Sequence, residues 1–387
     1  MKAKESCEEE MKMIEQLKKD KALHELKEQE VFTLLQTTLK SIGNIVHESV
    51  HVDNNEDNNP IVRTWGKISD IQVNSTKGRA HHHEVLAMID GYDPKRGQKI
   101  AGHRGFFLKG MGALLNMALV NYGMSFLNKK GYTPMHTPFF MKKSIMAETC
   151  QLSDFDEQLY KVSTGKDVTA EDPDNEFYLI ATSEQPISAY FYNEVLESSE
   201  LPVRFGGFST CFRKEAGAHG KDTWGIFRIH QFEKVEQFVI TTPEESWNEH
   251  ERMIQTSEEF MQSLELPYRV VNIVSGALND AAAKKYDLEA WFPGYNAYRE
   301  LVSCSNCTDF QSRGLNVKIG GKTTGKDGKG PEYVHMLNGT LCATERTLCC
   351  ILENYQTPDG VIVPKVLQPY VGTDFIPYTK DLPKKEI

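Results

Sequence analysis

The sequence lacks any long, uninterrupted run of apolar residues. Crossing a bilayer takes about 20 consecutive apolar residues, and no stretch of the 387-residue chain approaches that length. The first six residues, MKAKES, have neither the apolar core nor the small-residue cleavage site of a secretory signal. We therefore expect neither a membrane segment nor secretion.

Cysteine is also scarce, with 8 residues in the whole chain, too few for the disulfide framework of a small secreted protein. A reducing, cytosolic setting is therefore favoured. Apolar residues make up 40% and charged residues 25%, which is typical of a folded globular protein, and the length suggests roughly two domains. The net charge of -10 argues against a surface that binds nucleic acid throughout, but it leaves room for local basic patches.

The first part of the chain contains no proline up to residue 47 and differs from the rest. Apolar residues recur there at steps of mostly three to five, between many Glu and Lys residues, which predicts a helix. The heptad register is imperfect, so a coiled-coil arm and a plain surface helix both remain open. The polar stretch 53–60 breaks the helix. We therefore expect an N-terminal helical arm over 1–52 and a second domain over 53–387.

Beyond Pro60 the pattern mixes strands and helices, and no internal repeat is present. Short β-rich runs predict strands, whereas amphipathic stretches bounded by Gly or Pro predict helices. This order predicts an α+β domain built on an antiparallel sheet with flanking helices. The expected strands cover 83–89, 177–180 and 227–240, and the expected helices cover 113–127, 244–264 and 340–355.

Three local patterns resemble known sites but lack an essential part. Residues 320–326 have P-loop spacing, but Asp327 stands where a Ser or Thr would bind Mg²⁺. The glycines of 102–112 lie in no βαβ unit, which excludes a dinucleotide site. Cys304 and Cys307 form a single C-x2-C without a second pair, so buried structural thiols are favoured and no zinc is expected. His81, His82 and His83 could ligate a metal, but adjacent side chains in a strand point to opposite faces, so surface or satisfied histidines are favoured.

A predicted hairpin over 212–238 carries the first group of candidate site residues. Arg213 and Glu215 would share one strand face, and a guanidinium beside a carboxylate suits ATP, because the guanidinium can grip a phosphate. Phe232, Lys234 and Glu236 would share another face, offering a ring to stack on a base and a carboxylate to accept from an ammonium or hydroxyl group. A solvated hairpin with surface salt bridges explains the same pattern.

Two further segments add charge and oxygen ligands. Glu300 and Ser303 could both offer oxygen atoms to Mg²⁺. Residues 337–346 form an expected loop that leads into a buried helix with Arg346 in its first turns. A cation near a helix N-terminus is unfavourable unless an anion balances it, so Arg346 is a candidate for a polyphosphate contact.

Taken together, these segments resemble the class II aminoacyl-tRNA synthetases and, more closely, the cytosolic eukaryotic seryl-tRNA synthetases. Residues 131–140, with Pro138, match motif 1, residues 212–238 match motif 2 and residues 338–346 match motif 3. The serine-type segments are ATSEQP at 181–186, RIHQFEKVE at 228–236 and ELVSCSNCTD at 300–309. The resemblance runs from about residue 42 to about residue 370. It implies a homodimeric, cytoplasmic enzyme that forms seryl-adenylate from serine and ATP and charges tRNA(Ser), with tRNA(Sec) as a second candidate substrate.

The resemblance also implies roles for individual residues. Arg213 would hold the α-phosphate and the serine carboxylate, and Glu215 would contact the adenine side or the metal. Phe232 and Arg346 would sandwich the adenine, Glu300 and Ser303 would bind Mg²⁺, and Pro138 would mark the dimer motif. The implied catalytic residues are Arg213, Glu215 and Arg346; the implied ATP site is Arg213, Lys214, Glu215, Arg228, Phe232, Glu300, Leu301, Val302, Ser303 and Arg346; the implied serine site is Thr182, Ser183, Glu184, Arg213, Glu236, Asn338 and Thr340.

The chain departs from this family at its start. The family has a two-helix coiled coil of about a hundred residues that clamps the variable arm of tRNA(Ser), whereas about 45 residues precede the catalytic part here. The arm is therefore either short or incompletely given. Two alternatives remain open: a homologue that activates an amino acid for a carrier protein, and a non-catalytic paralogue.

Overall fold

The computed structural model describes residues 8–40, 42–68, 80–149, 157–163, 176–215, 220–320 and 332–383. The chain forms two compact units, Met1–Gly43 and Asn44–Ile387. The described residues of the first unit form the helix α1 (Glu8–Lys40), as the spacing of apolar residues predicted.

The second unit is built on a large sheet with the strand order β1-β11-β12-β13-β15-β10-β9-β4. Neighbouring strands are antiparallel except β4 and β9, which are parallel. The predicted α+β fold with a mostly antiparallel sheet is confirmed, and the sheet has eight strands. The strands are β1 (Ile61–Trp65), β4 (Thr133–His136), β9 (Val203–Phe212), β10 (Gln231–Thr241), β11 (Tyr268–Asn272), β12 (Lys284–Phe292), β13 (Ala297–Asn306) and β15 (His335–Ala343).

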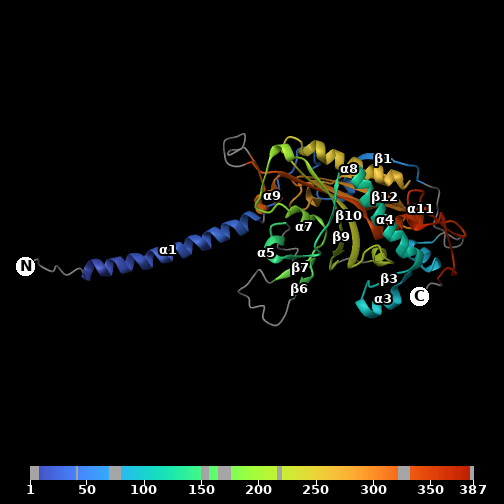
Figure 1. Cartoon of the computed structure of the whole chain (residues 1–387), viewed down its shortest axis with the longest axis horizontal. Coiled ribbons are helices and arrows are strands. Elements are labelled where there is room, and N and C mark those ends of the chain that lie inside the picture. Colours follow the sequence, from blue (N-terminus) through green and yellow to red (C-terminus); the bar gives the residue numbers. More distant parts are fainter. Residues whose placement is uncertain are drawn as a thin grey trace, which may run out of the picture. The chain divides into compact units, whose positions relative to one another are not determined.

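Two long helices cover one face of this sheet (Figure 1). They are α4 (Gly110–Lys129) and α8 (Ser246–Ser263), and both match predicted helices. Gln237 on β10 donates to the carbonyl of Met253 on α8, and Val235 lies against Gly123 on α4. The odd-numbered side chains of β10 therefore face these helices, which leaves its even-numbered side chains for the opposite face.

Shorter elements complete the second unit. A three-stranded sheet has the order β5-β7-β6, and the remaining strands form two-stranded pairs. The helices are α2 (His82–Met88), α3 (Pro94–Ala101), α5 (Lys143–Met146), α7 (Glu184–Ser188), α9 (Phe310–Leu315), α10 (Thr344–Asn354) and α11 (Gln368–Val371), and the 3₁₀ turns are Glu56–Asn58, Ser198–Glu200, Gly220–Thr223 and Ser275–Ala277. The strands are β2 (Tyr92–Asp93), β3 (Phe107–Leu108), β5 (Phe140–Lys142), β6 (Lys161–Val162), β7 (Phe177–Leu179), β8 (Val195–Leu196), β14 (Lys318–Ile319), β16 (Gly360–Ile362) and β17 (Phe375–Pro377).

Two predicted elements are wrong. The expected strand over 83–89 is the helix α2, which begins beside the buried ion pair of His82 with Glu353. The expected helix over 340–355 begins only at Thr344, because Thr340–Ala343 pair with β10 as the end of β15. The strand expected over 227–240 begins at Gln231. The P-loop-like residues 321–326 lie outside the described residues.

Candidate active site

A cavity of about 200 Å³ opens on the sheet face that α4 and α8 leave uncovered. Strands β10, β13 and β15, the segment after β9 and the start of α10 all contribute to it. Thirteen of the residues expected in the site from the sequence line this one cavity: Thr182, Glu184, Arg213, Glu215, Arg228, Phe232, Glu236, Glu300, Leu301, Ser303, Asn338, Thr340 and Arg346.

Strand β10 presents Phe232, Lys234 and Glu236 to the cavity by simple alternation. Arg213 and Glu215 also line the cavity, but not through strand alternation, because β9 ends at Phe212. The Arg213 guanidinium lies over the Phe232 ring, 5.3 Å from its centre. A flat aromatic face and a cation are therefore already adjacent.

Two β-bulges explain why residues three apart share the cavity face. Glu289 is opposite Glu300 and Leu288 is opposite Val302, which leaves Leu301 without a cross-strand partner. This extra residue brings both Glu300 and Ser303 to the cavity, although a regular strand would point them to opposite faces. A second bulge, at Leu341 on β15, likewise brings residues three apart to the cavity face.

Arg346 lies in the first turn of α10, close to the backbone of two other segments. Its Nε donates to the carbonyl of Phe227 at 3.3 Å, and its guanidinium lies 5.1 Å from the centre of the Phe227 ring. A terminal nitrogen is 3.7 Å from a carboxylate oxygen of Glu300. Burial lowers the pKa of Arg346, because removing a cation from water disfavours its charge. An anionic ligand would offset that cost.

The opposite end of the cavity carries two neighbouring carboxylates. Glu236 is buried, and its Oε2 accepts from the amide of Glu184 at 3.1 Å and from the Ser183 hydroxyl, while Oε1 lies 2.5 Å from Lys234 Nζ. Glu184 accepts from Asn338 Nδ2 at 3.0 Å and from Gln311 Nε2. Burial and the like charge of Glu236 raise the pKa of Glu184 to about 7. This end suits a small ligand with an ammonium group and a hydroxyl group.

Three expected site residues do not line the cavity. Val302 is fully buried in the core, and Ser183 instead donates to Glu236. The backbone amide of Lys214 donates to the carbonyl of Gln158. The cavity also contains Lys234, which the period-two alternation of the hairpin placed beside Phe232 and Glu236. No local pattern in the sequence indicated the remaining lining residues, which are Ile226, Phe227, Ile229, Asn279, Ser305, Ala343 and Glu345.

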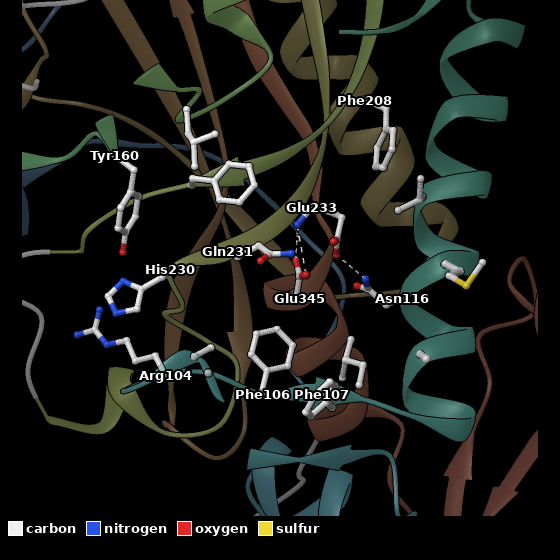
Figure 2. Close-up of a pocket in the computed structure, with 18 of the residues that line it drawn as sticks. Arg104, Phe106, Phe107, Asn116, Tyr160, Phe208, His230, Gln231, Glu233 and Glu345 are labelled. Atoms are coloured by element: carbon white, nitrogen blue, oxygen red, sulfur yellow. Dashed lines mark hydrogen bonds between the residues drawn. The ribbon is translucent and has the colours of Figure 1, made fainter. Parts of the chain in front are cut away.

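A second, larger cavity of about 670 Å³ adjoins the first and shares Glu345 with it. Figure 2 shows Phe106, Phe107 and Phe208 on its walls, with Asn116 reaching from α4 toward Glu233. Asn116 Nδ2 donates to Glu233 at 2.8 Å, and the Glu233 amide donates to the Glu345 carboxylate. Met117 and Phe107 line this cavity and are 59% and 46% exposed, so an apolar surface lies open here.

The geometry and the comparisons define a class of protein. Residues 160–355, which include the hairpin and all three strands of the cavity, match the class II core domain of the tRNA synthetases for G, H, P, S and T. This chain is therefore built on a class II synthetase core.

More specific similarity comes from whole-chain relatives. The cytoplasmic serine–tRNA ligase of Dictyostelium discoideum is 57% identical over 100% of this chain and 82% of its own length. Crystal structures of the Naegleria fowleri cytoplasmic serine–tRNA ligase with AMP and the Pyrococcus horikoshii seryl-tRNA synthetase with ATP are 53% and 37% identical, each with a TM-score of 0.84. They are matched over 93% and 98% of this chain and 82% and 86% of their own. The chain belongs to the serine–tRNA ligases.

Proposed function

We propose that this chain joins L-serine to ATP as seryl-adenylate and then transfers the seryl group to tRNA(Ser). The observation that carries the proposal is the single cavity that combines an aromatic and arginine-lined end with the paired carboxylates Glu184 and Glu236. Adenine and phosphates suit the first end, and the serine ammonium and hydroxyl groups suit the second. Since the similar serine–tRNA ligases, such as that of Dictyostelium discoideum, are named cytoplasmic, we assign the same compartment. Among the described residues, no helix is long and apolar enough to span a membrane.

In this proposal the reaction proceeds by positioning and charge neutralisation rather than through a covalent enzyme intermediate. The serine carboxylate attacks the α-phosphorus in line and pyrophosphate leaves. Arg213 would neutralise the α-phosphate and the serine carboxylate, Arg346 would balance the far phosphates, and Phe232 would stack on the adenine. The ribose hydroxyl of tRNA then attacks the adenylate carbonyl and AMP leaves.

The residues beside Arg346 also fit a magnesium ion. Glu300 and Ser303 offer oxygen atoms on one strand face, and Asp287 lies directly opposite Ser303. Asp287 is buried, and its Oδ1 accepts no hydrogen bond within the described part of the chain. A buried acidic oxygen without a donor favours a nearby cation. Glu300 and Ser303 would hold Mg²⁺, which would neutralise phosphate charge.

Serine should be the only amino acid that drives strong ATP–pyrophosphate exchange. A cavity that hydrogen-bonds a hydroxyl rejects alanine, because its polar groups would be left unpaired, and threonine should be excluded by shape. The measurement is exchange with each of the 20 amino acids. Comparable rates with alanine or threonine would contradict the serine assignment.

We further propose a homodimer that forms through the segment around Pro138. Strand β4 is an edge strand of the sheet, and the large apolar cavity lies open beside α4. Met117→Glu should place a charge in that apolar surface and shift the particle mass measured by light scattering from twice 43.9 kDa to the monomer value. Ile362→Glu, at an exposed residue of β16 outside this cavity, is the matched control. A monomeric wild-type chain would refute this proposal.

The first unit is proposed to contribute to tRNA binding and not to adenylate formation. The second unit begins at Asn44, whose side chain donates to the carbonyls of Ala281 and Cys307 at 2.9 and 2.8 Å. A cut after Gly43 preserves these bonds. Removing residues 1–43 should leave exchange within about twofold, while aminoacylation falls sharply, because contacts to tRNA backbone supply affinity. Unchanged aminoacylation would mean that α1 makes no tRNA contact that matters, and lost exchange would mean that it belongs to the catalytic fold.

A further inference from the structure

The buried residue His82 lies outside the smaller cavity, but it is hydrogen-bonded to the segment 224–227, which leads into that cavity. His82, at the start of α2, is 1% exposed and lies against Glu353 on α10, which is fully buried. The Nδ1 of His82 is 3.0 Å from Glu353 Oε1, and its Nε2 is 3.2 Å from the backbone carbonyl of Trp224. Glu353 also accepts from the amides of His82 and Gly294.

The identity of the partners determines the protonation of the ring. A carboxylate and a backbone carbonyl can only accept, so both ring nitrogens of His82 must donate, which requires the imidazolium form. Burial opposes this charge, but Cys349 and Glu353 raise the pKa of His82 well above its ordinary value. Burial likewise opposes ionisation of Glu353, yet the bonds from His82 and Gly294 hold its pKa below the ordinary range.

Helix α10 therefore holds the segment 224–227 at two points. Near its start, Arg346 donates to the carbonyl of Phe227. About two turns further along the same side, Glu353 holds His82 against the carbonyl of Trp224. Between them, Gly225 has φ of +61°, and a Cβ there would lie 2.8 Å from His82 Nε2. The backbone fits closely between α10 and α2.

We propose that His82 is a positioning residue that, with Glu353 as counterion, fixes the segment 224–227 so that Phe227 and Arg228 lie correctly in the ATP end of the cavity. This inference rests on the proposed function, because it assigns that end to ATP. Neither His82 nor Glu353 lines the cavity, so the effect reaches the nucleotide only through the backbone. The other groups facing the ring are Cys349, His83 and the rings of Phe227 and Tyr295.

The test compares His82→Gln and Glu353→Gln with Glu249→Gln in the full chain. Glu249 is also a buried acid with an arginine partner, Arg204, but it lies on α8 away from the cavity. Exchange at saturating serine should show a KM for ATP raised at least about tenfold in the first two variants, the scale of losing one hydrogen bond to a charged group, with kcat changed less. Glu249→Gln should lose thermal stability, because Arg204 loses its charged partner, but it should keep the wild-type KM for ATP.

The pH profile separates positioning from simple destabilisation. Because the pKa of His82 is raised in the fold, the wild-type KM for ATP should rise as pH increases through that folded value, and His82→Gln should remove this limb. If His82→Gln does not fold, Gly225→Ala should raise the KM for ATP in the same way, since it disturbs the same backbone from within the loop. An unchanged KM in a folded variant, beside an active wild type, would overturn the inference. An inactive wild type would instead refute the proposed function.

Discussion

Replacing Arg346 by alanine is expected to lower serine-dependent ATP–pyrophosphate exchange at least about a hundredfold, the usual scale for removing one charge-stabilising donor. The guanidinium lies 3.7 Å from a carboxylate oxygen of Glu300, and it also holds the Phe227 carbonyl at 3.3 Å. Its loss removes positive charge from the proposed phosphate site and releases one of the two attachments of the segment 224–227.

Two further substitutions separate charge from geometry at this position. Arg346→Lys keeps the charge but not the planar fork that bonds Phe227, so an intermediate loss is expected. Arg313→Ala is the matched control, because Arg313 also lies over an aromatic ring, that of Tyr333, and beside an acid, Asp309, but lies outside the cavity. Near-native exchange in Arg346→Ala would mean that ATP does not bind at this end.

The residues of the site could be predicted from the sequence better than the geometry that unites them. Alternation along β10 was enough to place Phe232 and Glu236 on one face, because a long strand in the middle of a sheet keeps a strict period of two. The joint presence of Glu300 and Ser303 depends on the bulge at Leu301, and no local pattern in the sequence indicates which residue loses its cross-strand partner.

The two elements that the sequence predicted wrongly, over 83–89 and 340–355, have a related cause. Strand β15 is paired on both sides and buried, so its apolar residues show neither a helical nor an alternating period, and the run into α10 looks like one long helix. In α2, seven residues are too few to distinguish a helix from a strand. What fixes that helix is the contact of His82 with Glu353, which lies 271 residues further along the chain. Only the folded chain brings such partners together.

Replacing Glu236 by glutamine should impair the use of serine far more than the binding of ATP. Glu236 is buried at the carboxylate end of the cavity, whereas the proposed phosphate contacts come from Arg213 and Arg346. The substitution removes the negative charge proposed to face the serine ammonium and leaves Lys234 without its partner at 2.5 Å. A hydrogen bond to a charged group contributes roughly 1.5–3 kcal/mol, so the KM for serine should rise about 10- to 100-fold.

The control for this variant is Glu258→Gln, which alters a buried acid paired with Arg63 and outside the cavity. It should leave both Michaelis constants near the wild-type values. Calorimetric titration of serine and of ATP into the Glu236 variant provides a direct check of which ligand is lost. Weakened ATP binding with intact serine binding would contradict the assignment of serine to this end of the cavity, because Glu236 would then contact the nucleotide instead.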